Sequence, residues 1–377
     1  MPHATSPRGR NLYLDLVKGL LIYLVVWGHA IQFVGYRATE NWLTAPFWSD
    51  PAFKLIYLFH MPLFMGISGY LCFTSIQRAT LGATATKRFR QLIIPVISWG
   101  VIWPLCLIAL ATIKLGDGTA WPSPPVLLTD IGHEISTRFW FLWAVFAGTL
   151  LTACARQWRW DSIAGLLVLS IALLLVPDVG IIPMIKYTVP FFFAGYLLRL
   201  HGVRLLDWVS RSRLGILFLT GVACYIFWTP ATYVYTSGLR VGVPEMPRIM
   251  FIYATGAAVS LGFLYLCHLL FRHWQPRWLQ HFGQHSLDIY IFQTFIFLLL
   301  HGRTHPFQET LYFSWVFAPL IALAVCGLCM LAGKTIGRVP IASQVLLGRN
   351  PQPWRQEPAP VRSASAPGAM ATAEPNR

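Results

Sequence analysis

Long apolar runs separated by short polar segments recur along most of the chain. A run of about 17 to 25 apolar residues is long enough for a membrane-spanning helix, and ten segments reach or approach that length. They lie at roughly residues 12–34, 52–75, 92–114, 138–155, 161–177, 183–200, 214–229, 247–271, 284–302 and 312–333. The pattern predicts an all-α, polytopic integral membrane protein with about ten transmembrane helices, of which the fifth to seventh are the shortest.

The composition excludes a soluble globular domain. Of the 377 residues, 56% are hydrophobic and 11% are charged, whereas soluble domains carry about 25% charged residues. The net charge of +15, from 29 Lys and Arg against 14 Asp and Glu, would indicate a nucleic-acid partner in a soluble protein. In a membrane protein it is also explained by an excess of basic residues in cytoplasmic loops.

The positions of the basic residues favour the membrane explanation. When the ten segments alternate in direction, 20 of the 29 basic residues fall on one side and Lys18 lies inside the first segment. The other side receives eight: Arg37, Lys54, Lys114, Arg138, Lys186, Arg240, Arg248 and Arg303. The side rich in Lys and Arg is expected to be cytoplasmic. Both termini are therefore predicted in the cytoplasm, and no nucleic-acid partner is expected.

The ends of the chain are predicted to contribute little to chemistry. The first apolar run is too long for a removable signal peptide, contains Lys18, and is followed by no small-residue cleavage site. Residues 349–377 are rich in Pro, Ala, Ser and Arg, which predicts a disordered cytoplasmic tail. With no internal repeat, we expect a cytoplasmic segment (1–11), one membrane domain (12–335) and this tail. All seven cysteines fall in apolar segments, so a disulfide framework is not expected.

Three ionisable residues lie in the first segment. Each costs about 2.5 to 3.5 kcal/mol inside a membrane and is a functional candidate. Asp15 precedes Lys18 by three residues, so the two are neighbours on a helix. His29 follows Lys18 by eleven residues, about three turns and about 16 Å along the helix, so both lie on one face. Asp15 and Lys18 could also be a snorkelling pair, and His29 an interhelical hydrogen bond; three ionisable groups near one another favour function.

The second segment adds two polar candidates. His60 comes at its outer end, in the same leaflet as His29, and Ser68 follows two turns later. Gly66 and Gly69 flank Ser68 and favour close packing of a neighbouring helix.

Beyond this segment, Lys87, Arg88 and Arg90 form a cationic cluster at the cytoplasmic mouth. Such a cluster suits anionic lipid headgroups or a phosphorylated cofactor. Its position below the face that carries Lys18 and His29 favours the cofactor.

Two further polar groups lie at segment ends. Those on the outer face are typical of an interface anchor but would also suit a sugar: Asp130, His133, Glu134 and Trp140. Those that open the ninth segment would cap its helix or line the same cavity: His285, Ser286 and Asp288.

These segments together resemble the membrane acyltransferase 3 family, multi-spanning O-acyltransferases that modify bacterial surface glycans. The resemblance covers about residues 10–335 and rests on five motifs in the same order. They are a basic residue, ten residues and His (Lys18 to His29); Phe59-His60-Met61-Pro62-Leu63-Phe64 with Ile67-Ser68-Gly69-Tyr70; Lys87, Arg88 and Arg90 before Pro95; Trp140-Phe141-Leu142; and Ser286-Leu287-x-Ile289-Tyr290.

The chain departs from the family pattern at two positions. Lys18 stands where most members have Arg, which removes the planar group that grips an anion through two hydrogen bonds; Lys is found in the branch similar to fucose 4-O-acetylases. Gln293 stands where many members have His after the Ile-Tyr motif. We therefore expect no catalytic role for Gln293.

The resemblance implies acetyl-CoA as a cytoplasmic donor substrate, no permanently bound cofactor, and a glycan hydroxyl as acceptor. It places the protein in the bacterial inner membrane. On this hypothesis Lys87, Arg88 and Arg90 bind the phosphates of acetyl-CoA, and the pantetheine arm passes Lys18. His29 then deprotonates the acceptor or carries the acetyl group.

Supporting roles are expected for three more residues. Asp15 would hold Lys18, while His60 and Ser68 would orient His29 or stabilise the oxyanion. On the outer face, Asp130, His133, Glu134 and Trp140 are the candidate acceptor-binding residues.

Other functions are compatible with the same residues. A transporter or flippase of lipid-linked glycans would use the buried charges as a proton relay, although few acids lie at mid-membrane depth. A membrane scaffold would use the motifs for packing, and a succinyl-type donor would fit the same enzyme class. Exopolysaccharide is the preferred acceptor, with O-antigen, capsule and lipid-linked repeat units as alternatives. Membrane lipids and other polysaccharide-assembly proteins are further expected partners.

Overall fold

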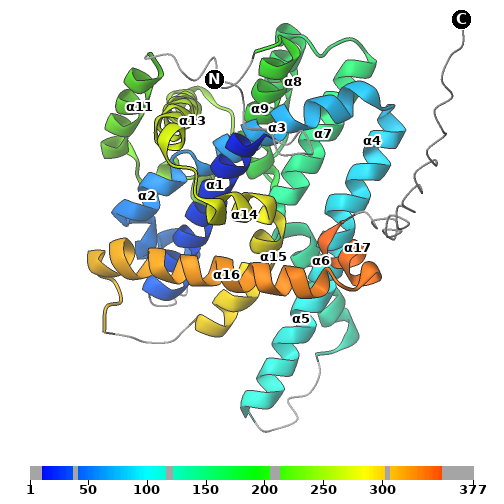
Figure 1. The fold of residues 1–377 in the computed structure, drawn as a ribbon, viewed down its shortest axis with the longest axis vertical. Helices are drawn as coiled ribbons and strands as arrows, with labels where there is room; N and C mark the ends of the chain where they lie inside the picture. The colour runs from blue at the N-terminus through cyan, green and yellow to red at the C-terminus, as the bar shows by residue number, and fades with distance from the viewer. Residues whose placement is uncertain (1–10, 37–40, 116–121, 204–212, 302–305, 350–377) are drawn as a thin grey trace, which may run out of the picture.

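A computed structural model of the chain describes residues 11–36, 41–115, 122–203, 213–301 and 306–349. The elements in these ranges are helices (Figure 1), which confirms the all-α expectation. Each of the ten predicted ranges contains a helix or a joined pair. By length and composition, five described helices could cross a membrane, or six if one bent pair is a single span. The ten-span count and the cytoplasmic termini stay predictions.

The helices long enough to span a membrane are composite. Leu12–Gly35 consists of α1 (Leu12–Ala30) and the π-helical turn Ile31–Gly35, and Pro51–Arg78 consists of α2 (Pro51–Tyr57) and α3 (His60–Arg78). Leu81–Ile113 consists of α4 (Leu81–Arg88), the turn Phe89–Ile93 and most of α5 (Ile94–Leu115). Val243–His273 contains α13 (Met246–His273), and Phe313–Ile336 contains α16 (Ala318–Ile336). The bent pair is α6 (Pro124–Thr137) and α7 (Trp140–Gln157). The remaining helices are α8 (Ile163–Leu174), α9 (Ile182–Leu200), α11 (Arg213–Ala223), α12 (Val234–Ser237), α14 (Arg277–Gln284), α15 (Ser286–Leu300) and α17 (Pro340–Leu347).

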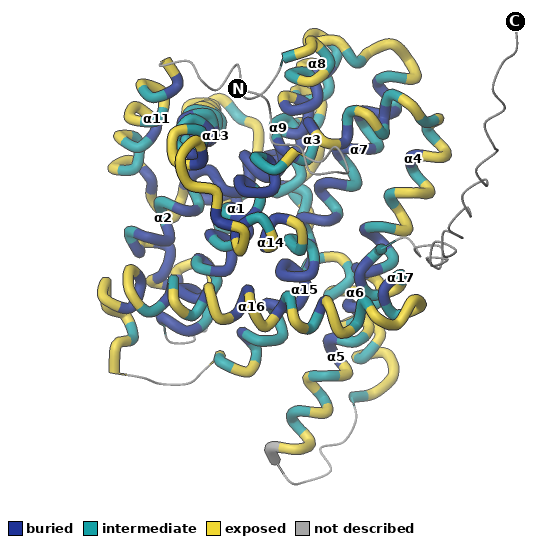
Figure 2. Tube along the Cα trace, viewed as in Figure 1, coloured by how far each residue is buried: buried dark blue, intermediate teal, exposed yellow. Residues whose placement is uncertain are grey.

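Helix α1 lies at the centre of the fold (Figures 1 and 2). Asn11 is its N-cap residue, and the Asn11 side chain accepts a hydrogen bond from the Leu14 amide at 3.3 Å. Its contacts are with α3, α13, α14, α15 and α16. Val17, Leu21 and Val26 are fully buried. The polar residues of α1 therefore face other helices.

The outer helices carry many exposed residues (Figure 2), and large apolar side chains are among them. They include Ile97, Val101, Leu105 and Leu107 on α5, Leu167, Val168 and Ile171 on α8, Ile216 and Leu219 on α11, and Leu320, Leu323, Leu328 and Leu331 on α16. Soluble monomers rarely expose so much contiguous apolar surface, whereas lipid tails cover it at no cost. With the spans described above, this surface identifies a multi-pass membrane protein.

Small residues allow the helices around α1 to approach closely. A Cβ atom on Gly19 of α1 would lie 1.9 Å from the Leu279 carbonyl oxygen of α14, and one on Gly283 would lie 1.9 Å from the Asp15 carbonyl oxygen. Between α3 and α9, a Cβ atom on Gly69 would lie 2.0 Å from the Phe192 carbonyl oxygen. The predicted close packing at Gly69 is confirmed.

Two helices begin inside the protein. The break between α2 and α3 places His60, 1% exposed, at the start of α3 after the buried Phe59. Helix α7 starts at Trp140 after the buried Phe139, where α6 and α7 meet at a 57° bend.

Asp50 caps α2 by accepting hydrogen bonds from the amides of Ala52 and Phe53, at 2.9 and 3.0 Å.

The predicted terminal segments are only partly described. Residues 1–10 and 350–377 lie outside the described ranges, so the interpretation of 350–377 as a disordered tail stays a prediction. Arg349, the first residue of that predicted tail, is described. It follows α17, a helix beyond the predicted end of the membrane domain at residue 335.

The contact between α3 and α9 predicts the effect of a single methyl group. A Cβ atom on Gly195 would lie 1.8 Å from the Gly66 carbonyl oxygen, which is part of a helix backbone and cannot move aside. Overpacking of this kind typically costs about 1–3 kcal/mol, so Gly195→Ala should lower the Tm of the purified protein in detergent. The control is Gly327→Ala on α16, where nothing lies within 4 Å of the added Cβ. Equal Tm values for the two variants would contradict this packing.

Candidate functional site

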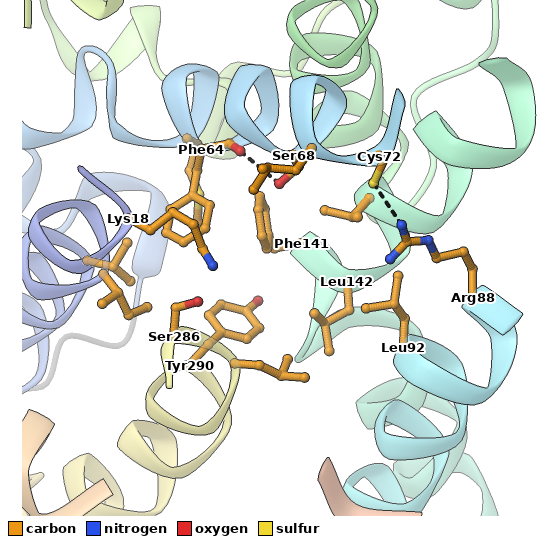
Figure 3. Close-up of a pocket in the computed structure, with 16 residues that line it drawn as sticks. Lys18, Phe64, Ser68, Cys72, Arg88, Leu92, Phe141, Leu142, Ser286 and Tyr290 are labelled. Carbon is orange, nitrogen blue, oxygen red and sulfur yellow. Dashed lines mark hydrogen bonds between the residues drawn. The ribbon is translucent and has the colours of Figure 1, made fainter. Parts of the chain in front are cut away.

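A cavity of about 240 Å³ lies beside α1, between α3, α7 and α15 (Figure 3). Its lining is mostly apolar, with five residues that carry charge or a hydroxyl group: Lys18, Ser68, Arg88, Ser286 and Tyr290. Phe141 and Leu142 belong to the apolar part. Each of the five sequence motifs therefore has a residue in this wall, although they lie far apart in the chain.

One face of α1 forms a side of the cavity. Lys18, Ile22 and Val25 all line it, as expected for residues four and three apart on a helix. The Lys18 ammonium group points into the cavity, toward Ser286 and Tyr290 (Figure 3). Asp15, 4% exposed, is buried outside this lining, where α1 meets α14.

The predicted cationic cluster divides into two parts. Arg88 lines the cavity, where its guanidinium donates to Cys72 Sγ at 3.1 Å and to Gln91 Oε1 at 3.2 Å (Figure 3). Its Nε is buried and has no hydrogen-bond partner among the described residues. Lys87 and Arg90 are exposed and do not line this cavity. Arg88 is therefore the member of the cluster available to a ligand inside.

His29 lies one helical turn beyond the Val25 end of the cavity wall. Its Nδ1 lies 3.2 Å from Oε1 of Gln293 on α15, and the Gln293 amide nitrogen donates to the Tyr290 carbonyl at 3.3 Å. Since Oε1 can only accept, Nδ1 carries the proton and Nε2 keeps its lone pair. The ring is therefore oriented as a general base would be. We expected no catalytic role for Gln293, and that stays a prediction; the hydrogen bond gives it a positioning role, because it orients the His29 ring.

His60 and Ser68 lie at opposite ends of the first half of α3. The His60 Nδ1 donates to the Ile56 carbonyl oxygen at 2.8 Å, and its ring lies 4.5 Å from that of Tyr57. His29 and His60 are close enough for their charges to interact. The Ser68 hydroxyl donates to the Phe64 carbonyl at 2.8 Å and faces the cavity. His60 thus lies with His29, and Ser68 with Lys18.

The predicted acceptor residues do not come together. Asp130 and His133 are exposed on α6. Glu134 pairs with Arg138, which lies 3.7 Å over the Trp103 ring. Among the four, Trp140 reaches the interior, where its ring lies 5.8 Å from that of Tyr235.

The segment after α16 contacts residues next to the cavity lining on two sides, at α15 and at the start of α5. Arg349 pairs with Asp288, which is 2% exposed and also lies 2.8 Å from His285 Nδ1, beside Ser286. On the opposite side, Trp99 Nε1 donates to the Leu346 carbonyl at 2.8 Å. A Cβ atom on Gly348, where φ is +61°, would lie 2.0 Å from the Gln91 carbonyl oxygen. The sequence offered no periodic signal for these contacts.

The described residues contain no group of three His, Cys, Asp or Glu side chains placed to share a metal ion. The polar groups of the site are instead cations, hydroxyls and imidazoles. They lie within a bundle of apolar helices, which is the arrangement of a membrane enzyme with an internal site.

Comparison with known proteins identifies the chemistry. Residues 11–334 match a family model described as an acyltransferase domain, and the chain belongs to this acyltransferase 3 family. It is similar to two proteins named nodulation protein NolL. That of Sinorhizobium fredii is 33% identical over 68% of each chain, and that of Mesorhizobium japonicum is 28% identical over 91% of this chain and 92% of its own. No solved structure matches the chain. The expectation of an acyltransferase is confirmed.

Arg349 gives a prediction for the C-terminal segment. Arg349→Ala leaves the buried Asp288 carboxylate without its guanidinium partner, so it should reduce the stability of the folded protein by about 1–3 kcal/mol. Two variants serve as controls: a chain that ends at Arg349, and Arg338→Ala, which removes an exposed arginine on the same segment. The measurement is the Tm in detergent. If the Tm of Arg349→Ala equals the Tm of both controls, the ion pair does not stabilise the site.

Proposed function

We propose that this acyltransferase moves an acetyl group from acetyl-CoA to a hydroxyl group of a bacterial cell-surface glycan. The observation that carries the proposal is a cavity lined by Lys18, Arg88 and Tyr290. It lies next to His29, whose ring is oriented by Gln293. A group-transfer enzyme needs such a base near the path of its donor. Membership of the acyltransferase 3 family supports the class of reaction.

The division of the cationic cluster fits the shape of the donor. A cavity of about 240 Å³ is below the usual range for drug-sized ligands, about 300–1,000 Å³, so it suits the acylated pantetheine arm better than the whole coenzyme. The phosphates would stay at the mouth, beside the exposed Lys87 and Arg90. Arg88 would contact the part of the donor that enters.

The proposed reaction uses His29 Nε2 as the base. As this nitrogen takes the proton of the acceptor hydroxyl, the hydroxyl oxygen bonds to the thioester carbonyl carbon. The resulting oxyanion is stabilised by hydrogen-bond donors, for which Tyr290, one helical turn from Gln293, is a candidate. The C–S bond then breaks, and the CoA thiolate takes the proton from the imidazolium. A second route, in which His29 briefly carries the acetyl group, uses the same residues.

The acceptor and the cellular context are the less constrained parts of the proposal. The names of the two similar proteins refer to nodulation and specify no acceptor. We retain exopolysaccharide as the preferred glycan and O-antigen, capsule and lipid-linked repeat units as alternatives. We place the protein in the inner membrane, as membership of the family implies. The apolar runs favour about ten spans, and the distribution of Lys and Arg favours cytoplasmic termini.

His29→Ala should abolish transfer. Loss of a general base typically lowers kcat by about 10²–10⁴-fold. The assay is incorporation of radiolabelled acetyl-CoA into alkali-deacylated surface glycan by proteoliposomes that contain the purified protein. His273→Ala replaces an exposed histidine at the end of α13 and is the control. Wild-type rates in His29→Ala would remove His29 from the mechanism. Glycan uptake without acetyl-CoA would favour a transporter.

The cationic cluster is tested by comparing two donors. S-acetyl-pantetheine lacks the nucleotide phosphates of acetyl-CoA. The double variant Lys87→Ala/Arg90→Ala should raise KM for acetyl-CoA by up to about 30-fold, since exposed charge pairs contribute up to about 1 kcal/mol each. Its KM for S-acetyl-pantetheine should not change. Arg88→Ala should raise KM for both donors. Equal effects of the double variant on both donors would contradict phosphate binding at the mouth.

A further inference from the structure

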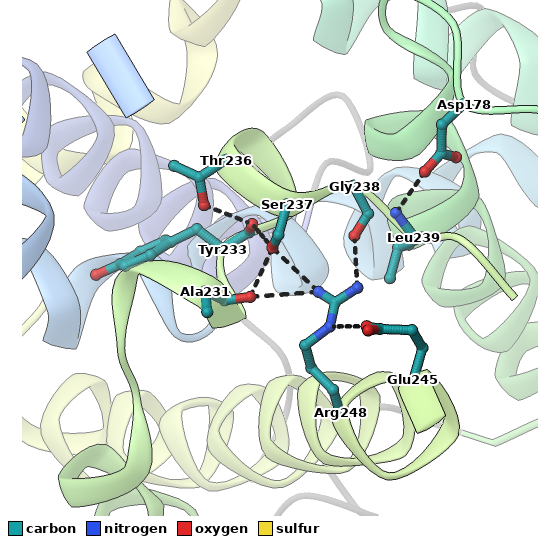
Figure 4. Close-up of polar contacts among 9 residues, drawn as sticks. All are labelled: Asp178, Ala231, Tyr233, Thr236, Ser237, Gly238, Leu239, Glu245 and Arg248. Atoms are coloured by element: carbon teal, nitrogen blue, oxygen red, sulfur yellow. Dashed lines mark hydrogen bonds and ion pairs between the residues drawn. The ribbon is translucent and has the colours of Figure 1, made fainter. Parts of the chain in front are cut away.

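The segment between α11 and α13 contains little regular helix, and hydrogen bonds to charged side chains hold it in place on two sides. On one side, Asp178 accepts from the Leu239 amide at 2.7 Å (Figure 4) and from the Lys186 ammonium at 2.6 Å. Lys186 is 1% exposed, so this ion pair is shielded from water. Breaking such a pair costs far more than breaking one at the surface. The Asp178 carboxylate, held by Lys186, therefore fixes the position of the segment at Leu239.

Arg248 of α13 fixes the other side of the same segment (Figure 4). Its Nε pairs with Glu245 at 2.7 Å. Its two terminal nitrogens donate to the Ala231 carbonyl at 3.3 Å, the Ser237 hydroxyl at 3.1 Å and the Gly238 carbonyl at 3.2 Å. The short helix α12 is thus held at both of its ends.

This anchoring places Tyr235 of α12 in the interior. Its ring lies 5.9 Å from the Tyr57 ring, 5.8 Å from the Trp140 ring, and 6.1 Å from the Trp48 ring, with which it is stacked. Tyr57, Tyr235 and Trp140 are all half-buried, so each keeps accessible surface deep in the fold. Tyr57 in turn contacts His60.

Three other tyrosines, Tyr57, Tyr187 and Tyr290, lie near enough to Tyr235 to interact with it electrostatically. Burial raises the pKa of Tyr235 well above its ordinary value, and the nearby phenols of Tyr57, Tyr187 and Tyr290 raise it further. The hydroxyl of Tyr187 is buried with no hydrogen-bond partner in the described ranges. That of Tyr290 opens onto the cavity beside Lys18 (Figure 3). The Tyr187 phenol can therefore donate a hydrogen bond to a ligand and accept one from it.

We propose that Tyr57, Tyr187 and Tyr235, with the Trp140 ring, form the subsite for the sugar ring of the acceptor. The inference rests on the proposed function and assigns residues to the acceptor half of the reaction. A pyranose offers hydroxyl groups to the phenols and an apolar ring face to the aromatic rings. Its position next to His60 and near Tyr290 brings a sugar hydroxyl toward the histidines and the cavity.

The test is Tyr235→Phe, which keeps the ring and removes only the hydroxyl. We expect KM for alkali-deacylated surface oligosaccharide to rise about 3- to 10-fold, the effect of one neutral hydrogen bond. KM for acetyl-CoA should stay unchanged. Tyr57→Phe should behave in the same way. The matched control is Tyr265→Phe, a half-buried tyrosine that contacts Gly215 on the far side of α13.

Three results would overturn the subsite. One is a higher KM for acetyl-CoA with no change for the oligosaccharide, which would assign the hydroxyls to the donor. Another is a wild-type KM for both substrates in both variants. The third is an equal rise in Tyr265→Phe.

Direct binding separates this inference from the proposed function. Calorimetric titration of the wild-type protein with acetyl-CoA and, separately, with the oligosaccharide needs no turnover. Weaker oligosaccharide binding by Tyr235→Phe would support the subsite even if the donor were not acetyl-CoA. Normal oligosaccharide binding by this variant, with acetyl transfer intact in the wild type, would reject the subsite and leave the proposed function standing.

Discussion

The reciprocal contact of Gly19 and Gly283 determines where the polar residues of α1 lie. With each glycine against the backbone of the other helix, α1 and α14 approach so closely that rotation of α1 about its axis is excluded. Lys18, next to Gly19, is thereby turned into the cavity, and the eleven-residue spacing carries His29 to the same side. Because α14 leads directly into α15, the same contact also positions Ser286, Tyr290 and Gln293. The cavity wall formed by α1 and α15 and the candidate base His29 thus depend on one pair of small residues.

The helical fold and most polar residues of the cavity wall could be predicted from the sequence, because both follow from the spacing of nearby residues. Helix periodicity relates Lys18 to His29, and an intramembrane charge must find a protein environment. Periodicity also explains why the cationic cluster divides between the cavity and the surface. Residues 87, 88 and 90 are spread around a helix by about 100° per residue, so they cannot all point into one cavity. Arg88 alone does so, while Lys87 and Arg90 stay exposed.

The contributions that the sequence did not reveal come from long-range contacts. Gln293 was set aside because it differs from the family pattern, yet its amide orients the His29 ring across 264 positions of the chain. Tyr235 belongs to a segment without helical periodicity, and its place depends on Asp178 and Arg248. Asp130 and His133 had plausible chemistry for a sugar, but α6 exposes them. Composition and spacing describe what a residue can do, whereas only packing decides what it meets.

The two helices that begin inside the protein give the site an electrostatic character of its own. Helices α3 and α7 start at His60 and Trp140, whose neighbours Tyr57 and Tyr235 are in ring contact. Each helix start carries partial positive charge from its unpaired amides, and apolar surroundings screen that charge poorly. The backbone itself thus favours negative charge near the His60 and Trp140 ends of the two helices. An enzyme built in this way needs few acidic or basic side chains at mid-membrane depth.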